Sequence, residues 1–120
     1  MDLTRTLEGK IIVREINGAC LPIEAFPRFV SQNNLFFLDS ALQIKGIARY
    51  SFLGFNPFLI IKTKHRKVTL IYGEELTEFE GNPFEAFRSI LRRFKIKDAE
   101  KAPIPFQCGA VGYFSYDLCH

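Results

Sequence analysis

The chain has 120 residues and a net charge of +3, and 48% of its residues are hydrophobic, including 13 Phe but no Trp. This composition predicts a packed globule with a core built from Phe, Ile and Leu, and it excludes a disordered chain. The length fits one domain, and the weak positive charge is not that of a typical nucleic-acid module.

The first half alternates strand and helix signals. Alternating side chains predict a strand over 11–16, closed by the turn residues Asn17-Gly18. Pro22 opens a helical pattern that Pro27 interrupts, so we expect a short or broken helix there. The apolar run 35–40 predicts a strand with both faces buried.

Further strand signals follow without a long interval. A strand is expected over 48–53, and residues 54–57 form a break. Residues 58–63 and 67–72 then predict a hairpin joined by Lys64-His65-Arg66, and a short strand over 76–79 extends that sheet.

A helix is predicted from Pro83 to about Lys95. Asn82 is a favoured N-cap, and the apolar positions fall on one helical face. Those positions are Phe84, Phe87, Leu91 and Phe94. The last element expected is a glycine-punctuated aromatic strand, 109–118. A strand of that kind needs cover on both faces, which predicts that residues 1–120 are one piece of a longer protein.

Runs of adjacent strands with two helices favour an α+β fold, mainly an antiparallel sheet or sandwich with two flanking helices. Three cysteines, Cys20, Cys108 and Cys119, lack CxxC spacing, so neither a disulfide framework nor a zinc site is indicated. Free thiols suit a reducing cytoplasm. We find no signal-peptide pattern and no apolar run long enough for a membrane span.

Motifs for catalysis are absent: there is no nucleophile elbow, P-loop, dinucleotide fingerprint or zinc-protease helix. No catalytic and no metal-binding residue is predicted in this chain. A Cys119–His120 dyad is disfavoured because adjacent strand residues face opposite ways. The basic turn 62–67 could contact phosphate, but a solvated hairpin tip that protects the sheet from aggregation is the favoured interpretation.

One polar group follows the apolar strand. Asp39 and Ser40 could receive the ammonium group of an amino acid, although such residues often simply end a strand and turn the chain. In the next strand Arg49 and Ser51 share one face, and Tyr50 lies on the other. A buried Arg49 would need a carboxylate such as Asp39, either as a structural pair or as part of a pocket with Ser40.

The ordered set of segments resembles a known family. The segments are Leu38-Asp39-Ser40-Ala41, Ala48 to Gly54 with Asn56-Pro57-Phe58, Asn82 to Phe87, Pro105-Phe106, and Gly109 to Leu118. Together they are similar to the amino-terminal region of the large subunit of chorismate-utilising synthases, aminodeoxychorismate synthase component I and anthranilate synthase component I. The resemblance covers roughly residues 10–118. Asp39-Ser40 and the ending Tyr113 to Leu118 look more like the aminodeoxychorismate branch, since anthranilate synthases tend to carry Glu before that serine.

Several expectations follow from the resemblance. The full subunit would convert chorismate, with ammonia from a glutamine amidotransferase subunit, into 4-amino-4-deoxychorismate for folate synthesis. The sister branch forms anthranilate for tryptophan. The Mg²⁺-dependent site of the family lies in the carboxyl-terminal catalytic region, so this fragment holds no cofactor, and alone it is expected to be inactive.

The resemblance also implies part of a tryptophan-type pocket. Its positions here are Leu38, Asp39, Ser40, Arg49, Tyr50 and Ser51. The expected partners are the amidotransferase, the chain's own catalytic region and a small amino acid, with no nucleic acid and no membrane. Two alternatives stay open: the regulatory domain of an anthranilate synthase, and a stand-alone amino-acid-binding module.

Overall fold

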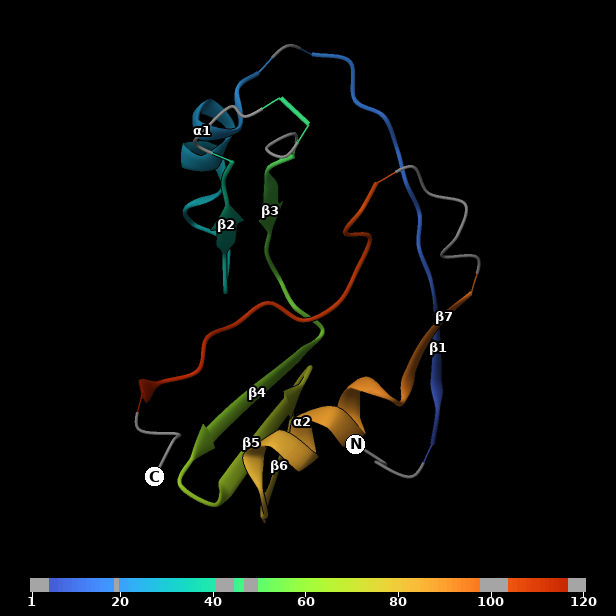
Figure 1. Ribbon diagram of the computed structural model, residues 1–120, viewed down its shortest axis with the longest axis vertical. Helices are drawn as coiled ribbons and strands as arrows, with labels where there is room; N and C mark the ends of the chain where they lie inside the picture. The colour runs from blue at the N-terminus through green and yellow to red at the C-terminus, as the bar shows by residue number, and fades with distance from the viewer. Residues whose placement is uncertain (1–4, 19, 41–44, 47–49, 98–103, 117–120) are drawn as a thin grey trace. The chain divides into compact units, whose positions relative to one another are not determined.

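The structure is a computed structural model that describes residues 5–18, 20–40, 45–46, 50–97 and 104–116. In chain order the elements are β1 (Leu7–Lys10), α1 (Pro22–Ala25), the 3-10 helix η1 (Phe26–Phe29), β2 (Phe36–Leu38), β3 (Phe52–Gly54), β4 (Leu59–Lys64), β5 (Lys67–Tyr72), β6 (Glu75–Glu80), α2 (Pro83–Leu91) and β7 (Phe94–Lys97). Mixed helix and strand content with antiparallel sheets confirms the α+β class (Figure 1). Two compact units are described separately: 1–14 with 59–120, and 15–58.

The core of the first unit lies between an antiparallel sheet, β4-β5-β6, and helix α2 (Figure 1). Val68, Leu70 and Ile90 are buried, and Phe79 and Phe94 are among the side chains that pack against them. The hairpin and its third strand confirm the sequence prediction, because alternating apolar residues on β5 match the period of a half-buried strand.

The turn between β4 and β5 has a specific backbone requirement. His65 adopts a φ of 53°, in the left-handed region that short hairpin turns use. On the neighbouring strand pair, Lys67 forms an ion pair of 2.8 Å with Glu78, and the Thr69 hydroxyl donates a hydrogen bond to the same carboxylate. These contacts join β5 to β6 on the exposed face of the sheet.

Helix α2 begins as predicted and ends earlier than predicted. The side chain of Asn82 accepts hydrogen bonds from the backbone N–H groups of Phe84 and Glu85, at 2.9 and 3.2 Å. The prediction of helix to Lys95 is wrong, because the chain leaves the helix after Leu91 and residues 94–97 form β7. Phe94 still reaches the core, but it does so from a strand.

The first strand lies earlier than predicted. Residues 11–16 form no regular element, and β1 occupies Leu7–Lys10 instead. Strand β1 pairs with β7 in parallel, with Leu7 opposite Phe94, and the Leu7 N–H donates to the Arg93 carbonyl at 2.8 Å. Sequence periodicity could not find this pairing because it joins segments far apart in the chain.

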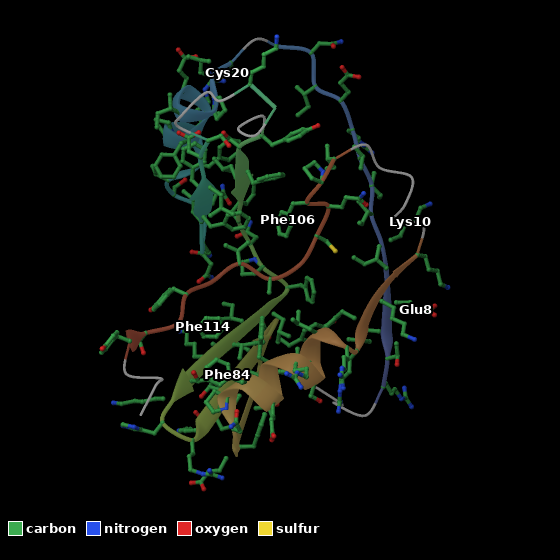
Figure 2. The ribbon with its side chains drawn as sticks, in the orientation of Figure 1. Glu8, Lys10, Cys20, Phe84, Phe106 and Phe114 are labelled. Carbon is green, nitrogen blue, oxygen red and sulfur yellow. The ribbon has the colours of Figure 1, made fainter. Side chains whose placement is uncertain are left out.

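The glycine-rich carboxyl-terminal segment is not a strand. Residues 109–115 have no regular structure, and the end of the predicted strand, 117–118, lies outside the described residues. Gly109 has a φ of 151°, and an added Cβ would lie 3.0 Å from the Phe106 ring. The Phe114 ring packs on Phe84 at a centroid distance of 5.5 Å (Figure 2). Without a neighbouring strand, other aromatic rings of the segment stay exposed, Tyr113 by 91%.

The second unit joins a broken helix to a short hairpin. Helix α1 passes directly into η1 at Phe26, which confirms the interruption expected at Pro27. Strands β2 and β3 pair antiparallel, and the Phe37 ring stacks on Phe26 at 5.3 Å. Both faces of β2 were expected to be buried, but Leu38 is 48% exposed.

Candidate functional site

The candidate site lies where the β2–β3 pair ends. The register places Leu38 opposite Phe52. Continued by one and two residues, it sets Asp39 opposite Ser51 and Ser40 opposite Tyr50. Sequence analysis therefore selected residues that the hairpin brings together in space. Arg49, the remaining predicted position, lies outside the described residues.

Three hydrogen bonds connect these positions. The Ser40 hydroxyl donates to the Tyr50 carbonyl at 2.6 Å, and the Ser40 N–H donates to Ser51 Oγ at 3.2 Å. Ser51 Oγ in turn donates to Asp39 Oδ1 at 2.8 Å. The Ser51 hydroxyl therefore links a backbone N–H to a carboxylate, and each bond in such a chain polarises the next.

Asp39 was a candidate partner for Arg49, which lies outside the described residues, and its Oδ1 atom accepts a hydrogen bond from the Ser51 hydroxyl. Sequence reasoning missed this bond. The available signal was the equal spacing of the two residues from the paired positions Leu38 and Phe52, which places Asp39 and Ser51 across from one another in an antiparallel pair.

The polarity of this group follows from its hydrogen bonds. A carbonyl oxygen only accepts, so the Ser40 hydroxyl must use its hydrogen on Tyr50, and its lone pairs remain to accept another donor. An ionised Asp39 also only accepts, and the residue is exposed. The site thus presents oxygen acceptors and one negative charge to solvent, which is the chemistry that receives an ammonium group.

Apolar surface borders these acceptors. Leu38 is half-exposed, and the Tyr50 ring lies 6.2 Å from Phe52 at an interplanar angle of 23°. Within the same pair of strands, β2 and β3, the Phe36 ring packs so closely against Gly54 that an added Cβ would overlap the ring. Aromatic and aliphatic side chains beside an amine-receiving group fit the side chain of an apolar amino acid.

Other candidate groups show no comparable arrangement. Cys20 and Cys108 are exposed free thiols, and Cys119 and His120 lie outside the described residues. No group of three or more His, Cys, Asp or Glu side chains within the described ranges is placed to hold a metal ion. In the same part of the chain, no helix is long and apolar enough to cross a membrane.

A shallow hollow lies along α2, lined by Phe84, Phe87, Arg88, Leu91 and Arg92. It holds no acid–base pair and is open to solvent, so it offers no reaction chemistry. We give more weight to the Asp39–Ser51 group, because its polar atoms converge and are ordered by hydrogen bonds.

Curated relatives confirm the family resemblance. The chain is 39% identical to anthranilate synthase component 1 of Acetivibrio thermocellus over 98 residues, which cover 81% of this chain and 20% of that relative. It is 37% identical to the protein of the same name from Methanothermobacter marburgensis over 97 residues, 79% of this chain and 20% of the relative. Aminodeoxychorismate synthase component 1 of Bacillus subtilis is 36% identical over 69 residues, 58% of this chain and 14% of the relative.

The chain therefore spans about a fifth of the length of the first two of these relatives. Neither a protein-family model nor a solved structure matches it. Homologues named for both activities match the same chain, so the two branches are not separated by similarity.

Proposed function

We propose that this chain, whose homologues are component 1 of two chorismate-utilising synthases, is the amino-terminal part of such a large subunit. The observation that carries the proposal is similarity over 81% of this chain to a relative of which it spans only a fifth. In this role the chain scaffolds a carboxyl-terminal catalytic region. That region binds chorismate and Mg²⁺ and receives ammonia from a glutamine amidotransferase subunit.

Within the family we propose the aminodeoxychorismate branch. Its support is the Asp39-Ser40 pair, which stands where the anthranilate branch tends to carry Glu before Ser. The reaction would convert chorismate and ammonia into 4-amino-4-deoxychorismate. Anthranilate synthesis is the second candidate, because relatives with that name match longer stretches of this chain.

The product of the complete gene, incubated with chorismate, Mg²⁺ and ammonia, separates the two branches. We expect 4-amino-4-deoxychorismate, and formation of anthranilate instead would overturn the branch assignment. If the assay yields neither compound, the proposed family role is overturned. The 120-residue chain alone is expected to give no product, and turnover by it would contradict the scaffold role.

We further propose that the Asp39–Ser51 group supplies half of an amino-acid pocket of the tryptophan type. Three features support it: the free lone pairs of Ser40, the exposed Asp39 carboxylate, and the apolar surface at Leu38 and Tyr50. The amino group of the ligand would donate to these oxygens while its side chain contacts the apolar surface. A half-pocket leaves much of the ligand in water, so tight binding needs the rest of the subunit.

Thermal unfolding of the complete gene product with and without tryptophan tests the pocket, because a ligand of the folded state raises the melting temperature. We expect a rise with tryptophan and a smaller one with alanine as ligand. Ser40→Arg should abolish the rise by placing a cation among the acceptors, whereas Ser40→Thr keeps the hydroxyl and retains it. Equal shifts in both variants would rule out Ser40 as a ligand contact.

A further inference from the structure

Strands β1 and β7 form a sheet that is too small for its type. They are the two strands of a parallel ribbon, and no described residue adds a third. Parallel strands normally belong to larger sheets, and an isolated two-stranded ribbon is marginally stable in water. The ribbon is therefore expected to be completed by further pairing.

The two faces of the ribbon differ in chemistry. Leu7 stands opposite Phe94, and the Phe94 side chain packs against the core of the first unit. The other face carries charge, with Glu8 in an ion pair with Lys97. In Figure 2 the side chains of Glu8 and Lys10 project outward from β1. Both faces are thus accounted for, and the unsatisfied surface of the ribbon is its edge.

The hydrogen-bond pattern identifies which amides of β1 point to that edge. The Leu7 N–H donates to Arg93, so Leu7 faces β7, and by alternation Gly9 does as well. Glu8 and Lys10 point their N–H and C=O groups the other way. Ile12 follows in the same register if the strand continues. An unpaired row of this kind is a template for another strand.

The chain beyond β1 retains the side-chain pattern of a strand. Residues 11–13 are Ile, Ile and Val, β-branched residues that favour a strand, and they begin the segment 11–16 for which the sequence predicted one. They have no regular structure, and none of the described backbone hydrogen bonds reaches them. The side chains of Ile12 and Val13 are 74% and 50% exposed. Leaving two adjacent β-branched apolar side chains in water is unfavourable, which is consistent with a segment that is covered in the complete protein.

We propose that β1 extends through residues 11–14 and receives an additional β-strand along the edge that faces away from β7. The occupant is an extended segment of the subunit's own polypeptide outside these 120 residues. This inference rests on the proposed function, under which roughly four fifths of the polypeptide lies beyond the chain. That length supplies the strand in cis, without the translational entropy cost that a separate partner incurs.

Amide hydrogen exchange, resolved by residue, tests the inference in this chain and in the product of the complete gene. In this chain, Glu8, Lys10 and Ile12 should exchange quickly, while Leu7 and Gly9 are protected by β7. In the complete product, the first three should become protected by at least about 100-fold, which corresponds to roughly 2.7 kcal/mol of local opening. Unchanged exchange at these three amides in the complete product would overturn the inference.

A second copy of this chain is the competing occupant, and concentration separates the two. Protection of Ile12 that rises with the concentration of the 120-residue chain alone would assign the edge to a homodimer and overturn the inference. Product formation is read separately. If the protein encoded by the complete gene has protected amides but forms neither 4-amino-4-deoxychorismate nor anthranilate, only the proposed function is refuted. If that protein is active but its amides are unprotected, only the added strand is refuted.

Matched variants at Ile12 give an independent readout. Ile12→Pro removes the edge N–H, whereas Ile12→Thr keeps both the N–H and β-branching. We expect Ile12→Pro to lower the melting temperature of the complete product by several degrees more than Ile12→Thr does. In the 120-residue chain the two variants should differ little, and an equal difference in both proteins would contradict the added strand.

Discussion

Ser51 holds the candidate site together, and its hydroxyl can be removed alone. Ser51→Ala deletes the acceptor of the Ser40 N–H and the donor to Asp39. A net contribution of about 0.5–1.5 kcal/mol per hydrogen bond gives a loss of about 1–2 kcal/mol in the free energy of unfolding. The lower half of the range for each bond is appropriate because Asp39 is exposed and water can replace Ser51 there.

For a chain of this size, that loss corresponds to a fall in melting temperature of about 4–8 °C. The chain has no Trp, so unfolding is followed by far-ultraviolet circular dichroism in urea. A local readout accompanies it: the Ser40 amide should exchange about tenfold faster with solvent in Ser51→Ala, in proportion to the lost bond. Ser51→Thr keeps the hydroxyl and serves as the matched control.

The carboxylate end of the same chain of bonds is tested by a double-mutant cycle. Asp39→Asn retains the Oδ1 acceptor and should cost less stability than Asp39→Ala. Combined with Ser51→Ala, Asp39→Ala should show a coupling of about 0.5 kcal/mol or more. The reasoning is refuted if the coupling is zero and the Ser40 amide exchanges at the same rate in all variants.

Three further outcomes are expected. Gly54→Ala should destabilise the protein by about 1–3 kcal/mol in urea, since its Cβ would displace the Phe36 ring, and Phe36→Leu in the same background should recover part of the loss. Asn82→Ala should cost about 1 kcal/mol through loss of the helix cap and Asn82→Asp much less, so equal losses would contradict capping. The hydrogen bond from Lys67 lowers the pKa of Glu78 below its usual value of 4.5, so its stabilising effect is present above that pH and is lost as pH falls through the folded-state pKa. The urea midpoint of the parent should therefore fall more steeply with decreasing pH than that of Lys67→Met. If the two midpoints change with pH in parallel, the Lys67–Glu78 ion pair is not the source of the pH-dependent stability.

Local sequence patterns determined the candidate site only in part. Asp39 and Ser40 were selected because they follow an apolar strand, and the family resemblance added Ser51; the register of β2 and β3 brings the three together. The assignment of hydrogen bonds was not accessible, because the side chain of Asp39 had several potential donors within the next strand. Only three-dimensional placement shows that Ser51 donates a hydrogen bond to Asp39.

The sequence alone determined the elements whose signals are local. The β4–β5 hairpin follows from alternation and a short turn, the start of α2 from its Asn82 cap, and the broken first helix from Pro27. Each of these depends on residues a few positions apart, so the chain's covalent order already brings the interacting groups together.

Tertiary structure decided where α2 stops and which segments pair. Phe94 fits the helical period, yet the core receives it from β7, and the Arg93 carbonyl binds Leu7 from the start of the chain. Residues 11–14 and 109–115 pair with no strand among the described residues. A strand signal becomes a strand only when another backbone satisfies its hydrogen bonds, and that partner is not encoded in the local sequence.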